Sequence, residues 1–162
     1  MVVTAASDGR FAITAGGYAL DPAEPDHYRA LFAAIGVPDD ILCAWGLGDA
    51  GGDPFAGCMA LTRALADQDA RPRLTLLGAG MREVTGREVL DPAAAMASGL
   101  VPVLPQELPG VDCRSIDLDP AESGGPVPGL ANALAAPWQT GDALALRGGY
   151  LWRRDTAAVL LD

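Results

Sequence analysis

The sequence predicts an α/β protein whose mainly parallel sheet is flanked by helices. Apolar, β-branched runs alternate with helical segments of roughly 10–15 residues, an order typical of βαβ crossovers. The 162 residues, half of them apolar, suit a single domain. Gly148 and Gly149 separate two strand-like runs near the end of the sequence and predict a C-terminal β-hairpin.

The first half of the sequence predicts two strand–helix units. In order, we expect a strand at 9–16, a helix ending at Gly36, a strand at 41–47 and a helix at 54–68. Asp26 and Asp53 stand where the N-caps of the two helices belong, and Pro54 suits a first helical position. The strand at 41–47 is apolar on both faces, so we expect it to be buried within the sheet.

The second half predicts two further strands with their connections. In order, we expect a strand at 73–77, a hairpin-like excursion at 81–90, a helix from Asp91 to Gly99, an irregular segment, a strand at 111–119, a short helix ended by Pro137 and the hairpin. Thr85 and Gly86 mark the turn of the excursion. The whole order predicts a Rossmann-like fold, which the resemblance described below implies to be truncated.

Charge and cysteine content limit the partners and the compartment. The formal net charge of -10 repels phosphate backbones and anionic lipid, so we expect no nucleic acid or membrane partner. The first residues lack a basic and long apolar segment, which predicts a cytoplasmic protein. Cys43, Cys58 and Cys113 are far apart in the sequence and each lies in an apolar run, where cysteine behaves as a small hydrophobe.

The absence of lysine excludes several kinds of chemistry. All eleven basic residues are arginine. The chain therefore has no P-loop lysine, no Schiff-base lysine and no Tyr–Lys pair of the short-chain dehydrogenase type. Arginine cannot carry a proton in place of lysine because its pKa stays above about 12. We expect no catalytic, cofactor-binding or metal-binding residues in this chain.

One glycine-rich segment suggests an alternative. Residues Gly46 to Gly51 read G-x-G-x-x-G after a strand, which is the pattern of a dinucleotide-binding loop. However, the expected helix begins only at Pro54, and Asp49 and Asp53 would repel a pyrophosphate near the helix start. We therefore keep an NAD(P)-binding oxidoreductase that uses this loop as the alternative to a chain without binding residues. A free-standing ligand-binding domain, with its site at the carboxyl ends of the strands, is a further one.

Other candidate residues favour structural roles. His27 is the only histidine and has no nucleophile or metal partner in the pattern, so we interpret it as a solvated residue at a helix start. The carboxylates of Asp112, Asp117 and Asp119 are expected at strand ends and turns. Tryptophans are expected to pack, and basic side chains of the C-terminal hairpin to decorate its surface; these are Trp45, Trp138, Trp152, Arg147, Arg153 and Arg154.

The ordered set of segments resembles the N-terminal structural subdomain of modular type I polyketide synthase ketoreductases. The matching stretches are Gly9–Phe11, Asp26–Phe32, Ile41–Leu47, Leu74–Gly80, Val84–Gly86, Asp91–Ala95, Gly99–Leu100, Glu107–Pro109, Arg114–Asp119, Ala145–Gly149 and Trp152–Arg154. The resemblance covers about residues 9–155, and its strength lies in the order rather than in any single motif. Val103–Gln106 departs from the family's usual segment before Glu-x-Pro.

The resemblance implies a non-catalytic scaffold. In that family this subdomain binds no cofactor and supports a catalytic subdomain that holds NADPH and the catalytic Lys, Ser and Tyr. Asp162 ends the sequence where that catalytic half would begin, which also fits a pseudo-ketoreductase. We expect a catalytic subdomain or adjacent synthase domains as partners, or a homodimer formed through an exposed apolar surface.

Overall fold

Two sheets form the framework of the protein. The computed structural model describes residues 1–48, 52–122 and 125–157. The larger sheet has five strands in spatial order β4-β5-β6-β7-β8, and β8 is antiparallel to its neighbour whereas the other pairs are parallel. Its strands are β4 (Asp40–Gly46), β5 (Arg73–Ala79), β6 (Asp112–Leu118), β7 (Ala143–Arg147) and β8 (Tyr150–Arg153). This arrangement confirms the predicted truncated Rossmann-like fold and its C-terminal hairpin.

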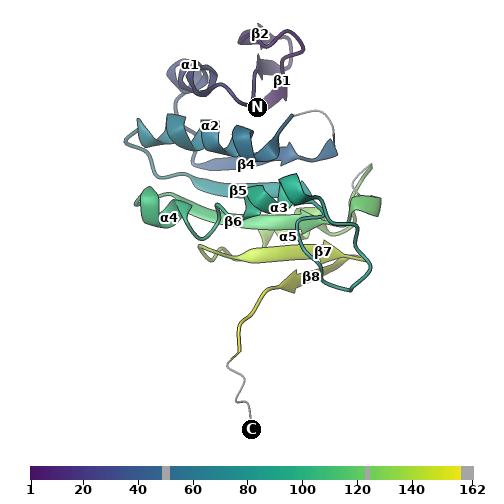
Figure 1. Ribbon diagram of the computed structural model, residues 1–162. Helices are drawn as coiled ribbons and strands as arrows, with labels where there is room; N and C mark the ends of the chain where they lie inside the picture. The colour runs from purple at the N-terminus through teal and green to yellow at the C-terminus, as the bar shows by residue number, and fades with distance from the viewer. Residues whose placement is uncertain (49–51, 123–124, 158–162) are drawn as a thin grey trace.

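Helices cover both faces of the five-stranded sheet (Figure 1). One face packs against α2 (Pro54–Ala66), α3 (Pro92–Ser98) and α4 (Leu104–Glu107). The other face packs against α5 (Leu130–Ala135), which follows the short 3₁₀ helix η2 (Pro120–Glu122). Two apolar clusters result: Leu74 and Cys113 belong to the first, and Ile116 and Leu144 to the second. The predicted alternation along β6 is confirmed, since successive side chains enter opposite clusters.

Local signals place the helix ends. Asp53 accepts a hydrogen bond from Phe55 N and caps α2, as predicted, and Asp91 does the same for α3 through Ala93 N. Gly36 ends α1 (Pro25–Ile35) with φ of 75°. The N-cap of α1 is Glu24 rather than the predicted Asp26. Proline fixes φ and lacks an N–H group, so the helix begins at Pro25, one residue before the predicted cap.

The strand predicted at 9–16 is present only over Ala12–Thr14, and it lies outside the main sheet. That region and its flanks form a separate three-stranded sheet of order β1-β3-β2, from β1 (Val2–Ala5), β2 (Ala12–Thr14) and β3 (Gly17–Leu20). Gly17 has φ of 151°, and a Cβ atom there would lie 2.0 Å from Val2 O. The parallel pairing of β1 with β3 therefore requires glycine at this position.

Strand β4 is an edge strand, which corrects its predicted burial within the sheet. It pairs only with β5 among the described residues, and its Leu42 side chain is 49% exposed. The register of the β4–β5 ladder shifts between Cys43 and Gly46, which marks a bulge or irregularity. In Figure 1 the three-stranded sheet and α1 lie beyond β4, and β8 forms the opposite edge.

The excursion at 81–90 contains no strand, so the predicted hairpin there is wrong. Its backbone N–H groups donate hydrogen bonds to side-chain carboxylates, as described below, instead of to a partner strand. Among the described residues, no helix is long and apolar enough to span a bilayer, and α2, with 13 residues, is the longest.

Candidate functional site

Ligands of open α/β sheets bind beyond the carboxyl ends of the parallel strands. In this chain those ends are Gly46 of β4, Ala79 of β5, Leu118 of β6 and Arg147 of β7. We therefore built the candidate site from the side chains and loops that meet at this edge.

The Gly46–Gly51 loop does not fit a pyrophosphate. A Cβ atom at Gly46 would lie 3.1 Å from Gly78 Cα, so this glycine permits close packing of β4 on β5. At the start of α2, the Asp53 carboxylate already accepts the Phe55 N–H group, and Pro54 has no N–H group to offer. A phosphate would meet a carboxylate where the helix N-terminus should supply donors. Residues 49–51, and with them Asp49, lie outside the described residues.

Arg147 occupies the centre of the carboxyl edge. It lies at the end of β7, and its side chain is 4% exposed. Its guanidinium group donates five hydrogen bonds, to Glu88 Oε1, Asp117 Oδ2, Asp117 O, Leu146 O and Arg82 O, at 2.7 to 3.0 Å. Because a guanidinium group has five N–H donors, every donor has an acceptor. The predicted role of Arg147 as a surface decoration of the hairpin is wrong.

Asp117 is the fully buried acceptor beside Arg147. Its carboxylate accepts hydrogen bonds from Met81 N at 2.8 Å and Arg82 N at 2.9 Å, and from Arg147 Nη2 at 2.7 Å. Asp117 therefore holds the first residues after β5 against the end of β6. This buried ion pair corrects the role at a strand end or turn that we expected for Asp117. Position 80, directly before Met81, requires glycine because a Cβ atom there would lie 2.9 Å from Val89 O.

Glu88 organises the rest of the loop. Its carboxylate accepts hydrogen bonds from four consecutive backbone N–H groups at residues 84–87 and from Thr85 Oγ1. It also pairs with Arg147 at 3.0 Å. Removal from water would raise the pKa of Glu88, but the hydrogen bonds from Thr85 and its neighbours and from Arg147 outweigh that effect and hold the pKa well below its usual range.

Arg82 completes this cluster, which we call the edge cluster: Arg82, Glu88, Asp117 and Arg147. Arg82 donates to Ser115 Oγ at 2.7 Å, and its Nη1 atom is buried without a hydrogen-bond partner in the part of the chain that the structure describes. Desolvation lowers the pKa of Arg82, while Asp117 partly offsets that effect. Two arginines and two carboxylates thus form a compact cluster at the carboxyl ends of β6 and β7.

The sequence held a signal for this cluster that our prediction missed. Asp117 stands between Ile116 and Leu118 in a strand buried on both faces, and Arg147 follows the fully buried run 143–146. A charge in such a strand must be paired to be tolerated. Two buried neighbouring strands carrying opposite charges at the same end therefore indicate an ion pair.

The other predicted residues are dispersed. His27 is half-buried, its Nδ1 accepts the Asp21 N–H group at 3.1 Å, and its ring lies near Phe11. Asp112 accepts a hydrogen bond from Thr140, and Asp119 accepts one from Ala121 N, so these two carboxylates have the expected turn roles. None of these residues joins the edge cluster among the described contacts.

The three tryptophans differ in environment. Trp138 packs over the buried guanidinium group of Arg114, whose Cζ lies 4.1 Å from the ring centroid. Trp45 donates from Nε1 to Tyr28 Oη at 2.8 Å. Trp152, on β8, is 49% exposed and contradicts its expected packing role.

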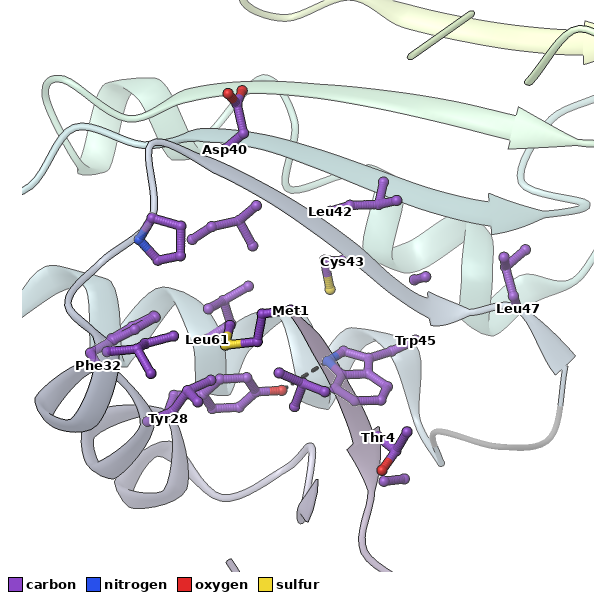
Figure 2. A pocket seen from close by; sticks show the side chains of 17 residues that line it. Met1, Thr4, Tyr28, Phe32, Asp40, Leu42, Cys43, Trp45, Leu47 and Leu61 are labelled. Carbon is purple, nitrogen blue, oxygen red and sulfur yellow. Dashed lines mark hydrogen bonds between the residues drawn. The ribbon is translucent and has the colours of Figure 1, made fainter. Parts of the chain in front are cut away.

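An apolar cavity of about 360 Å³ lies beside the free edge of β4 (Figure 2). Its walls come from β1, α1, α2 and β4 and include Val3, Phe32, Leu42, Cys43 and Trp45. Tyr28 Oη donates to Pro22 O at 3.0 Å, and burial raises the pKa of Tyr28. The cavity is thus mainly apolar, with its tyrosine hydroxyl already satisfied.

Comparison with known proteins shows the fold. No family model and no curated protein matches the sequence. The structure is similar to part of a solved adenylation, ketoreductase and pseudo-Asub multidomain structure of a keto acid-selecting NRPS module, with a TM-score of 0.72 and 18% identity over 92% of this chain. It is also similar to a short-chain dehydrogenase from Mycobacterium avium, with a TM-score of 0.54 and 18% identity over 91% of this chain.

These likenesses define a fold of the ketoreductase and short-chain dehydrogenase type. The chain spans 14% of the multidomain structure and 68% of the dehydrogenase. At 18% identity the likeness concerns the fold alone. It confirms the Rossmann-type, ketoreductase-like part of our expectation.

Replacing Arg147 with methionine tests the edge cluster. The Arg147→Met variant leaves the Asp117 carboxylate buried without its cation, so we expect a loss of about 3–5 kcal/mol in the free energy of unfolding. Urea denaturation followed by circular dichroism measures it. Arg87→Met, at an exposed position of the same loop, is the control and should stay within about 0.5 kcal/mol of the unmodified protein. Equal losses in both variants would contradict a central role for Arg147.

The lowered pKa of Glu88 predicts a pH dependence of stability. A carboxyl group with a folded-state pKa below its unfolded value stabilises the fold above about pH 4.3 and loses that contribution as the pH falls towards the folded-state pKa. Glu88→Gln should therefore lower the urea midpoint at pH 7, with the difference shrinking between about pH 4 and pH 2. Glu83→Gln, at an exposed position of the loop, should show no such trend.

Proposed function

We propose that this chain is a non-catalytic structural subdomain of a ketoreductase in a multidomain synthase, and that it stabilises and positions a catalytic partner subdomain. The main support is the edge cluster, because Arg147 and its carboxylate partners fill the position where an α/β fold of this type would bind a ligand. In this proposal NADPH binds to the partner, not to this chain.

The fold comparison supports a synthase setting. The multidomain structure named above places a domain of this shape in a module with adenylation and ketoreductase parts, of which this chain matches 14%. The ordered sequence segments favour a polyketide synthase as the parent, whereas the structural likeness is to an NRPS module. A ketoreductase is the element common to both assignments.

Strand β8, an edge strand exposed on both faces, offers a surface for such a partner. Its four residues are exposed, and the side chains of Tyr150, Leu151 and Trp152 are 75%, 41% and 49% exposed. An edge strand with exposed aromatic side chains presents both free backbone groups and apolar area to another domain. We propose that the catalytic subdomain covers this strand, and that a second copy of the chain can do so when the partner is absent.

A ligand-binding role is the second candidate, and the cavity at β4 favours it. The cavity runs along β4 from Asp40 to Leu47, at the side of the sheet. Our sequence-based alternative had placed the site beyond the carboxyl ends of the strands instead. An apolar small molecule retained by the purified chain in native mass spectrometry would favour this role over the scaffold.

Two measurements on the purified chain test the scaffold proposal. Calorimetric titration with NADPH should give no heat of binding, and micromolar binding would contradict the proposal. Pull-down by the catalytic subdomain of the same synthase should succeed. Trp152→Ser should weaken that association by about tenfold or more, because exposed aromatic residues dominate such contacts.

The matched control for Trp152→Ser is Ile13→Ser. Ile13 is 77% exposed on β2, at the opposite end of the structure (Figure 1), and its substitution should leave the association unchanged. Equal weakening by both variants would remove β8 as the docking surface. Light scattering reports whether the chain alone forms dimers through the same strand.

A further inference from the structure

Two cysteine thiols that lie far apart in the sequence meet in the core. Cys43 on β4 and Cys58 on α2 are both buried, and their Sγ atoms are 3.6 Å apart. This hydrogen-bond contact is about 1.6 Å longer than an S–S bond. A disulfide therefore requires the two sulfur atoms to approach each other by about this distance, through side-chain rotation and movement of α2 against β4.

The apolar cavity leads to one of the two thiols. Cys43 is part of the cavity wall, and in Figure 2 its sulfur atom points into the space between β4 and Met1. Cys58 does not line the cavity and lies behind Cys43 on α2. A small neutral oxidant entering the cavity thus reaches Cys43 first.

The hydrogen bond between the thiols makes them unequal. Either sulfur atom can donate in the hydrogen bond between the two thiols. The contact with Cys58 lowers the pKa of Cys43 against the opposing effect of burial, and the contact with Cys43 together with burial raises the pKa of Cys58. Because Cys43 also lines the cavity, we expect it to be the thiol that reacts as a thiolate. Cys113 on β6 makes no hydrogen bond to another thiol among the described contacts, and its sulfur donates only to Arg114 O. Burial, together with the nearby Cys43, raises the pKa of Cys113 to about 12.

We propose that Cys43 and Cys58 form a dithiol site that a peroxide converts into a reversible disulfide. The Cys43 thiolate attacks the O–O bond, forming a sulfenic acid and releasing water or an alcohol. The Cys58 thiol then attacks the sulfenic sulfur, the S–S bond forms, and a second molecule of water leaves. The two thiols lose two electrons in total, and the peroxide gains them.

The bridge fixes an edge strand of the sheet. It links β4 to α2 across a loop that contains the Gly46–Gly51 segment, and it lies in the wall of the cavity. A thiol reductant reverses it. This inference is independent of the proposed scaffold role, because it concerns only the thiols of this chain.

Peptide mapping of the full chain after treatment with hydrogen peroxide tests the proposal. Residues 30–63 form one tryptic peptide, because no arginine or lysine lies between Arg29 and Arg63. An internal disulfide lowers the mass of this peptide by about 2 Da, whereas sulfoxide formation at Met59 raises it. Cleavage before Asp49 and Asp53 separates the two cysteines, so only a disulfide keeps the two fragments together. The oxidised protein should unfold about 5 °C or more above the reduced one.

Cysteine-to-alanine variants test the role of each thiol separately. Cys113→Ala should form the same bridge, and Cys58→Ala should stop at the sulfenic acid of Cys43, which dimedone traps. The mapping of the unmodified chain decides the question even if Cys58→Ala fails to fold. A bridge that forms only in denaturant, a bridge that includes Cys113, or oxidation of Cys43 to higher acids without a bridge would each overturn the proposal.

Discussion

The contact between Arg147 and Asp117 determines the architecture of the carboxyl edge. Both side chains are almost fully buried, and each is acceptable there only because the other is present. The pair also fixes the backbone. The Asp117 carboxylate accepts hydrogen bonds from Met81 N and Arg82 N, and Arg147 donates hydrogen bonds to Arg82 O and to the Asp117 carbonyl oxygen. One charge pair thus joins β6, β7 and the loop after β5. Met81, which is also buried, supplies the apolar contact of the same loop.

Glu88 connects Arg147 at the end of β7 to the backbone of the loop at 84–87. A single carboxylate satisfies four consecutive N–H groups, so a segment without regular structure still has its donors paired. The carboxyl ends of β6 and β7, at an edge where α/β sheets commonly bind ligands, are therefore occupied by side chains and backbone groups that pair with one another.

Local patterns in the sequence predicted much of the fold, and long-range pairing accounts for most of what was missed. Asp53, Asp91 and Gly36 act as caps through contacts within a few residues, so their roles were readable. The three-stranded N-terminal sheet depends on the meeting of Gly17 with Val2, fifteen positions apart. Arg147 and Asp117 lie thirty positions apart, and their pairing became visible only once β6 and β7 were neighbours.

The irregularity in the β4 ladder has a consequence for assembly. Between Cys43 and Gly46 the spacing of this edge departs from that of a regular strand, and β1 and α1 stand beside it across the cavity. An incoming strand would find no even row of donors and acceptors there. The β4 edge is therefore a poorer template for an added strand than the edge at β8.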